Sequence, residues 1–156
     1  MMDEQAVNRA IELHADSVRR VCFLYLKSKE DTEDIFQEVF LKYLLRKDGF
    51  ESQAHEKAWL IRVAINCCKD FLKSFFKKKT STLDFDIPFS DEKDREVLDA
   101  VMQLDEHYRE VIYLQYYEGY SAPEIAQMLG KNTNTVYTWI ARAKKELKKS
   151  LGGELE

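Results

Sequence analysis

The stretch SAPEIAQMLGKNTNTVYTWIARAKKELKK, residues 121–149, decides the fold of the C-terminal part of the chain. Ser121 and Glu124 have the spacing of a capping box, which predicts the start of a short helix. Gly130 predicts the end of that helix, because glycine tolerates the left-handed conformation of a helix C-cap. Asn132 then predicts the cap of a second helix. Two helices joined by so tight a turn indicate a helix-turn-helix.

The second of these helices is amphipathic. Its apolar residues recur at helical spacing and predict a buried stripe: Val136, Ile140, Ala143 and Leu147. In a helix-turn-helix the second helix lies in the DNA major groove, and its outer face reads the bases. The residues expected on that outer face are Asn134, Thr135, Tyr137, Thr138, Arg142, Lys144 and Lys145.

The end of this stretch is basic. Residues 131–149 hold six basic residues and one acid, Glu146, and such an excess suits contact with phosphates. An ordinary corner of a helical bundle with a solvated basic end would show the same pattern. On this stretch alone both interpretations stay open.

The composition favours a helical chain of one ordinary or two small domains, since 156 residues contain only 5 Gly and 2 Pro. The net charge of −4 hides a separation of charge. Basic zones at 69–79 and 131–149 flank an acidic segment, residues 84–106, with nine acids against two basic residues. Charged runs are often only solvated faces, so this separation alone does not establish nucleic-acid binding.

We expect neither a membrane span nor a metal. No run of about 18 apolar residues is present, and the N-terminus MMDEQAVNRA lacks the plan of a signal peptide. Cys22, Cys67 and Cys68 form no C-x-x-C pair and no His cluster accompanies them, so they predict buried or half-buried thiols in a reducing cytosol. No cofactor is expected.

The N-terminal half predicts three long helices. The first spans about 4–27. The second spans 31–47 and is capped by Asp31 or Thr32, and the third follows a loop that runs to about His55. In the second helix one polar face carries a single leucine and is a candidate docking surface for a basic partner. This face holds Asp34, Gln37, Glu38 and Leu41. A plain solvent face is the alternative.

The third helix, residues 57–79, predicts burial of Ala58, Ile61, Ile65, Cys68 and Leu72. Its other side interleaves an aromatic residue, an amide and charges, a composition that can stack on and track single-stranded nucleic acid. The residues on that side are Trp59, Arg62, Asn66, Lys69, Asp70 and Lys73. A purely structural helix is the alternative.

The predicted fold class is all-α, with two small helical domains joined by a flexible acidic linker. The boundaries are 1–79, 80–91 for the linker, and 92–156 for the domain with the helix-turn-helix. The alternating apolar residues at 83–89 would allow a strand, but an isolated strand has nothing to pair with, so we reject it. Helices are expected at 92–103 and 106–118, with Tyr116 helping to pack the latter.

Three segments together resemble the extracytoplasmic-function (ECF) sigma factors, the smallest class of bacterial sigma factors. The family segment D-x-E-D-[ILV]-x-Q-E-[VA]-F of region 2 resembles DTEDIFQEVFLKYL, residues 31–44, and the next region 2 helix resembles AWLIRVAINCCKDFL, residues 58–72. Region 4 resembles HYREVIYLQYYEGYSAPEIAQMLGKNTNTVYTWIARAKKELK, residues 107–148. The resemblance covers nearly the whole chain, in order.

The resemblance implies a cytoplasmic protein without a catalytic centre that binds core RNA polymerase and directs it to promoters. The face from Asp34 to Leu41 would dock on the clamp helices of the largest polymerase subunit. The loop 48–56, with Asn66 and Asp70, would capture an unstacked base of the −10 element, and Trp59 and Lys73 are further candidates. The −35 element would be read by Lys131, Asn134, Thr135, Tyr137, Thr138, Trp139, Arg142 and Lys145. The linker would run toward the RNA path.

Two residues depart from the family pattern. Tyr137 and Trp139 stand where basic residues are usual, and both are expected to point toward DNA or a partner protein. Lys131 replaces an apolar residue before the helix cap. The family also implies an anti-sigma factor, often membrane-bound, that covers both domains.

Two other classes of protein are weighed against this one. A DNA-binding regulator that never binds polymerase would share the helix-turn-helix, but it has no use for the DTEDIFQEVF surface. An enzyme would need acids that converge on a metal, whereas the acids here lie along helices and the linker.

Overall fold

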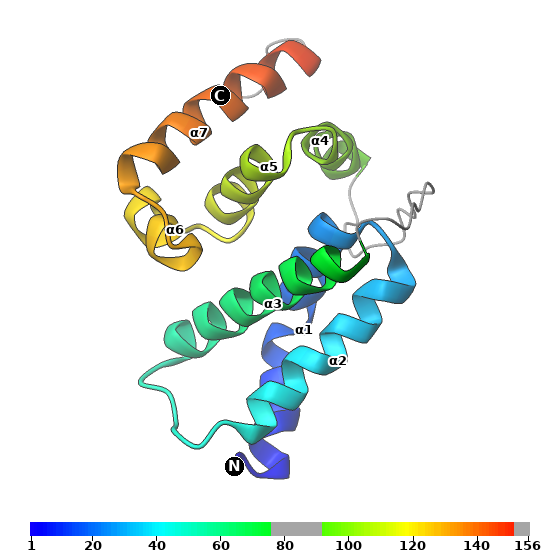
Figure 1. The fold of residues 1–156 in the computed structure, drawn as a ribbon, viewed down its shortest axis with the longest axis vertical. Coiled ribbons are helices and arrows are strands. Elements are labelled where there is room, and N and C mark those ends of the chain that lie inside the picture. The colour runs from blue at the N-terminus through cyan, green and yellow to red at the C-terminus, as the bar shows by residue number, and fades with distance from the viewer. Residues whose placement is uncertain (76–91, 152–156) are drawn as a thin grey trace. The chain divides into compact units, whose positions relative to one another are not determined.

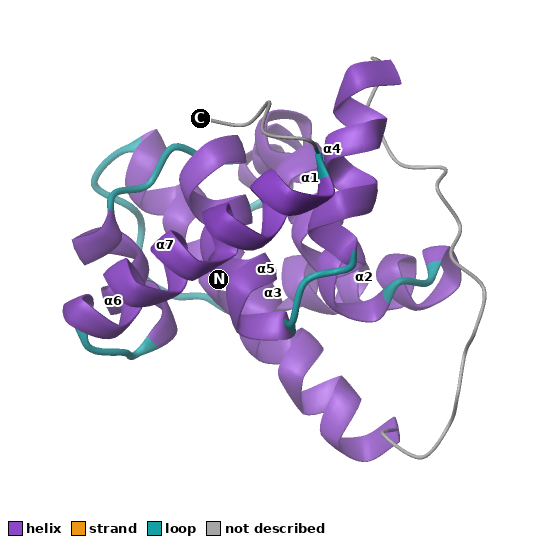
Figure 2. Cartoon of the chain, turned by 90° about the horizontal axis from the view of Figure 1, so that it is seen from above, coloured by secondary structure: helices purple, strands orange, loops and turns teal. Residues whose placement is uncertain are grey.

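The computed structural model describes residues 1–75 and 92–151, and the chain divides into two compact units, Met1–Pro88 and Phe89–Glu156. Within the described ranges every regular element is a helix (Figures 1 and 2). The predicted all-α class with a C-terminal helix-turn-helix is therefore confirmed. The predicted linker, the strand rejected within it and the last five residues lie outside the described residues.

The N-terminal unit consists of three long helices, α1 (Glu4–Leu26), α2 (Lys29–Leu45) and α3 (Gln53–Phe75). Each packs against the other two, in blue, cyan and green in Figure 1. The core forms because each helix turns one apolar stripe inward, as amphipathic helices do. Its fully buried members include Ala10, Val18, Cys22, Val39, Tyr43, Leu60, Ile61, Ala64 and Cys68.

The two turns of this unit differ from their predictions. Lys27 adopts the left-handed conformation, with φ 54°, so the chain reverses at once after α1. Ser28 then caps α2 by accepting a hydrogen bond from the backbone N–H of Asp31 at 3.1 Å. The predicted cap at Asp31 or Thr32 is therefore wrong, and Thr32 is buried inside the helix.

The third helix begins at Gln53, four residues earlier than predicted. The hydroxyl of Ser52 accepts a hydrogen bond from the backbone N–H of His55 at 3.1 Å, which satisfies one of the open donors of the first turn. The loop between α2 and α3 is thus shorter than the predicted 48–56 segment, whose second half forms the start of α3.

The C-terminal unit consists of α4 (Glu92–Met102), α5 (Glu106–Ile112), the π-helix η1 (Tyr113–Tyr117), α6 (Ala122–Leu129) and α7 (Thr133–Ser150). The long helix α7 packs on α4, α5 and α6. The core of the unit is made by Leu98, Val101, Met102, Val111, Ile112, Tyr113, Leu114, Ile125, Val136, Ile140, Ala143 and Leu147.

The single helix predicted over 106–118 is instead an α-helix followed by a π-helix. A π turn contains one residue more than an α turn, so the side chains after it shift to another face. Tyr116, predicted to pack inside, is consequently 42% exposed. The rings of Tyr113 and Tyr117 stack 5.5 Å apart across this widened turn.

The helix-turn-helix has the capping chemistry that the sequence predicts. The backbone N–H of Glu124 donates to the Ser121 hydroxyl at 3.3 Å, and the Ser121 N–H donates to the Glu124 carboxylate at 2.8 Å. Gly130 ends α6 with φ 67°, and the Asn132 side chain caps α7. The four residues predicted for the inner stripe of α7 are all buried.

Candidate protein and nucleic-acid interfaces

One face of α2 is open to solvent. Asp34, Gln37 and Glu38 are exposed on it, and Leu41 follows with 54% exposure. Leu45, one helical turn further, is 59% exposed and extends the face beyond the predicted set. In the sequence, its position four residues after Leu41 indicates that the two leucines share one face of the helix. Two neighbouring exposed leucines beside acidic residues form a surface suited to another protein.

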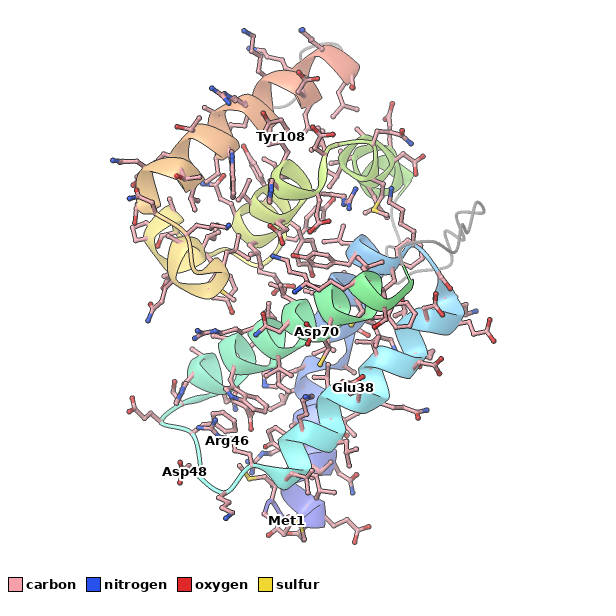
Figure 3. The ribbon with its side chains drawn as sticks, viewed as in Figure 1. Met1, Glu38, Arg46, Asp48, Asp70 and Tyr108 are labelled. Atoms are coloured by element: carbon pink, nitrogen blue, oxygen red, sulfur yellow. The ribbon has the colours of Figure 1, made fainter. Side chains whose placement is uncertain are left out.

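Glu38, labelled on α2 in Figure 3, also reaches α3. Its carboxylate hydrogen-bonds the Cys67 thiol, and burial followed by the charge of Glu38 raises the pKa of Cys67 to about 12. A hydrogen bond with Cys22, together with burial, raises the pKa of Cys68. All three thiols are buried. The raised pKa values keep Cys67 and Cys68 protonated at neutral pH, which makes these two thiols poor nucleophiles.

The loop between α2 and α3 carries an aromatic cluster. The ring of Phe50 stacks on Tyr43, with 5.8 Å between centroids and 11° between planes, and it lies 5.6 Å from the ring of Trp59. Trp59 is half-buried in consequence. The structure therefore joins this tryptophan to the loop, whereas the sequence placed it on an open helix face.

A cavity of about 170 Å³ lies beside this cluster. The loop and the first turn of α3 form one side of it, and the N-terminal end of α1 forms the other. Its lining is Met2, Ala6, Arg9, Tyr43, Gly49, Phe50, Ser52, Gln53 and Glu56. An aromatic wall with polar groups around it suits a planar polar ligand. The contribution of α1 was missed, because nothing in the sequence connects residues 2–9 with residues 49–56.

A buried polar triad lies beside this cavity, and two of its members, Tyr43 and Glu56, line the cavity. Glu56 accepts a hydrogen bond from the Tyr43 hydroxyl at 2.6 Å, and its other oxygen lies 3.1 Å from Nε2 of His14. Burial and then the Glu56 hydrogen bond raise the pKa of Tyr43 to about 12. The triad links all three helices of the unit, and His14 is buried in the core.

The predicted −10 residues on α3 form a stripe that starts at the half-buried Trp59. Asn66, Asp70 and Lys73 are exposed and follow at helical spacing. At 1.5 Å per residue the stripe from Trp59 to Lys73 is about 21 Å long. Asn66 and Asp70 thus lie well along the helix from the cavity, which they do not line. In Figure 3, Asp70 is labelled far from Arg46 and Asp48 of the loop.

The outward side of α7 is polar and basic. Among the predicted −35 residues, Lys131, Asn134, Tyr137, Thr138, Arg142 and Lys145 are exposed, and Thr135 is half-buried. Tyr137 is 57% exposed, as expected of a residue that faces a partner. Lys144 lies 5.6 Å from the centroid of the exposed Tyr116 ring.

Trp139 differs from Tyr137. Its indole stacks on the imidazole of His107 in α5, with centroids 4.4 Å apart. It is half-buried, unlike Tyr137, and its expected contact with DNA or a partner protein stays a prediction. Trp139 is half-buried because it lies on the flank of α7 that packs against α5.

Both units match known protein families. The family model described as "Sigma-70 region 2" matches residues 10–75, and the one described as "Sigma-70, region 4" matches residues 94–147. Among its relatives, the RNA polymerase sigma factor SigV of Bacillus subtilis is 30% identical, over 90% of this chain and 88% of its own length. The ECF RNA polymerase sigma factor SigW of the same organism is 25% identical, over 96% and 90%.

Solved structures show the same fold. The sigma factor RpoE of Bartonella quintana, crystallised with the anti-sigma factor NepR, superposes with a TM-score of 0.77 at 20% identity and covers 94% of this chain and 97% of its own. CnrH, solved with the cytosolic domain of CnrY, gives 0.69 at 23% identity and covers 97% and 91%. No helix among residues 1–75 and 92–151 is long and apolar enough to cross a membrane.

Proposed function

Because the chain belongs to the ECF subfamily of RNA polymerase sigma factors, we propose which of its surfaces perform the steps of promoter recognition. A sigma factor binds core RNA polymerase and directs promoter-specific initiation of transcription. We assign these steps to residues 1–79 for polymerase docking and the −10 element, 80–91 as linker, and 92–156 for the −35 element. The protein acts without a catalytic centre, in the cytoplasm where polymerase and promoters are.

The exposed face of α2 docks on the clamp helices of the largest polymerase subunit. Asp34 and Glu38 supply negative charge for a basic partner, Gln37 supplies hydrogen bonds, and Leu41 with Leu45 supplies an apolar contact. The observation that carries this proposal is the exposure of two neighbouring leucines on an otherwise polar face. Exposed apolar side chains of this kind contribute favourable free energy only when a partner buries them.

The loop cavity receives an unstacked base of the −10 element. Its volume of about 170 Å³ and its aromatic wall of Tyr43 and Phe50 suit a planar base, whose edge could meet Ser52 and Gln53. The stripe Asn66, Asp70 and Lys73 then contacts the neighbouring nucleotides of the same strand along α3. Trp59 connects the two parts, because it belongs both to the aromatic cluster and to the stripe.

The outer side of α7 reads the −35 element in the major groove. Asn134, Thr138 and Arg142 are suited to base edges, and Lys131 and Lys145 to phosphates. Tyr137 packs on sugars or thymine methyl groups. Trp139 supports this surface through its stack on His107.

An anti-sigma factor holds the protein inactive by covering both units. The structural relatives bound to such partners support this proposal through the shared fold only. A partner that left the α2 face accessible in a pull-down experiment would argue against it.

Co-elution with bacterial core RNA polymerase tests the proposed docking face. The variant Asp34→Ala/Glu38→Ala should lose co-elution. The matched control is Glu12→Ala/Asp16→Ala, which removes two exposed acids from α1 at the same spacing and should keep it. If Asp34→Ala/Glu38→Ala co-elutes with core polymerase as well as the control variant does, the docking face is refuted. Failure of the wild type to bind, with no inhibitor present, would favour a stand-alone DNA-binding regulator.

A further inference from the structure

One side chain, Arg46, ties together the loop between α2 and α3. Its Nε donates to the carbonyl oxygen of Asp48 at 2.9 Å, and its Nη2 donates to the carbonyl oxygen of Gly49 at 3.3 Å. A loop lacks the regular backbone partners that a helix provides, so its carbonyl groups need other donors. The guanidinium supplies two of them at once, because its donors form a rigid planar fork.

The same guanidinium lies against the aromatic wall of the cavity. Its central carbon is 4.2 Å from the centroid of the Phe50 ring and 5.1 Å from that of Trp59. Cations attract the faces of aromatic rings at such distances. Arg46 therefore links the backbone of the loop, through Asp48 and Gly49, to the ring that forms the cavity wall, through Phe50.

We propose that Arg46 is a positioning residue for base capture, which holds the loop in the shape of its cavity before DNA arrives. This inference rests on the proposed role of the cavity. Binding costs less when the site is already ordered, because the loop does not lose its conformational freedom at that moment. Arg46 thus acts through Phe50 and Gly49, both of which line the cavity.

A simpler role for Arg46 is attraction of DNA by its charge. Two observations favour positioning instead: the side chain is half-buried, and its Nε and Nη2 are engaged within the loop. Lys47 offers the matched control, because it is exposed and carries the same charge one residue further along. Lysine at position 46 would keep the charge but lose the planar fork.

The first experiment measures order in the loop without DNA, by amide hydrogen exchange of the full chain. In Arg46→Lys, the amide of Glu51, which donates to Nδ1 of His55 at 3.1 Å, should exchange about tenfold faster, because opening of the loop becomes easier. Lys47→Ala should exchange like the wild type. Wild-type exchange in Arg46→Lys would overturn the inference whatever the role of the cavity. Circular dichroism verifies that the helices persist, and Arg46→Gln is the second variant should the lysine variant not fold.

The second experiment measures DNA capture by the holoenzyme. The probe is a promoter that the wild-type holoenzyme selects from randomised duplexes, prepared with a mismatched, pre-opened −10 segment. Arg46→Lys should bind this probe about five- to tenfold more weakly, and Lys47→Ala within about twofold of wild type. Ala6→Trp fills the cavity from α1, leaves the sequence of the loop unchanged, and should weaken binding as well.

The variants separate two kinds of failure. If Ala6→Trp weakens binding while Arg46→Lys does not, the cavity takes the base but its prior ordering by Arg46 is irrelevant, and the inference is overturned. If Ala6→Trp binds like the wild type, the proposed function of the cavity fails and the inference fails with it. Loss of binding in both, with faster loop exchange in Arg46→Lys, supports the inference.

Discussion

The imidazole of His107 lies parallel to the indole of Trp139, with 4.4 Å between the ring centroids and 8° between their planes. This contact joins the start of α5 to the flank of α7. It explains why Trp139 is half-buried although Tyr137, two residues earlier, is exposed. The orientation of the proposed −35 surface thus depends on a residue outside the helix-turn-helix.

Replacing His107 by Ala should lower the free energy of unfolding of the C-terminal unit by about 1 kcal/mol, because a stacked ring pair contributes roughly this amount. His107→Phe keeps a ring and should retain most of the stability. Urea denaturation of the full chain with Trp59→Phe as background, followed by the fluorescence of Trp139, measures both. An equal loss in the two variants would show that the stack is not the source of the stability.

Replacing Glu56 by Ala should destabilise the N-terminal unit by about 3 kcal/mol, since it leaves the buried Tyr43 hydroxyl and His14 imidazole without their partner. Glu56→Gln should lose less, because an amide can accept from the hydroxyl and donate to the other tautomer of the imidazole. Glu51→Ala, at an exposed position, is the control. Thermal and urea unfolding measure the three variants.

The stability of the protein should fall between pH 10 and 12, in part through Tyr43. In the folded protein the pKa of Tyr43 is raised to about 12, from an ordinary value of 10.0. Above pH 10 the unfolded chain releases this proton while the folded protein keeps it, so unfolding becomes more favourable as pH rises. A two-unit shift corresponds to roughly 2–3 kcal/mol. The free energy of unfolding of Tyr43→Phe should fall less over this pH range. Tyr137→Phe, which changes an exposed residue, is the control and should lose as much stability as the wild type.

The helix-turn-helix could be predicted closely because its determinants are local. Ser121, Glu124, Gly130 and Asn132 act on backbone groups within a few residues, and each has the predicted role. The cap of α2 was missed for a related reason. Several polar residues there could serve as the cap, and only the reversal of the chain at Lys27 selects Ser28.

The loop cavity could not be predicted, because it depends on contacts between distant parts of the chain. His14 and Glu56 are 42 residues apart, and the cavity also needs the start of α1. The sequence indicated the loop as a candidate site only through its resemblance to a family. It gave no signal for Arg46, whose role depends on the packing of Phe50 against Trp59.

Replacing Gly130 by Ala should destabilise the C-terminal unit by about 1 kcal/mol, because a residue with a Cβ is strained in the left-handed conformation. Gly130 has φ 67°, and a Cβ added there would meet nothing within 4 Å, so backbone strain is the expected cause. Gly49→Ala is the matched control: its Cβ would also meet nothing within 4 Å, and its φ is not positive. It should leave the melting temperature unchanged.

Replacing Leu41 and Leu45 together by Ala should weaken binding to core RNA polymerase about tenfold, as expected when apolar anchors are removed from the centre of an interface. Both side chains are more than half exposed in the free protein, so the melting temperature should stay near that of the wild type. Leu13→Ala is the control, since Leu13 is 48% exposed but lies on α1. Competition with labelled wild-type protein for core polymerase measures the affinities. Wild-type affinity in the double variant would exclude the leucines from the interface, and the acidic residues of the same face would then have to account for docking.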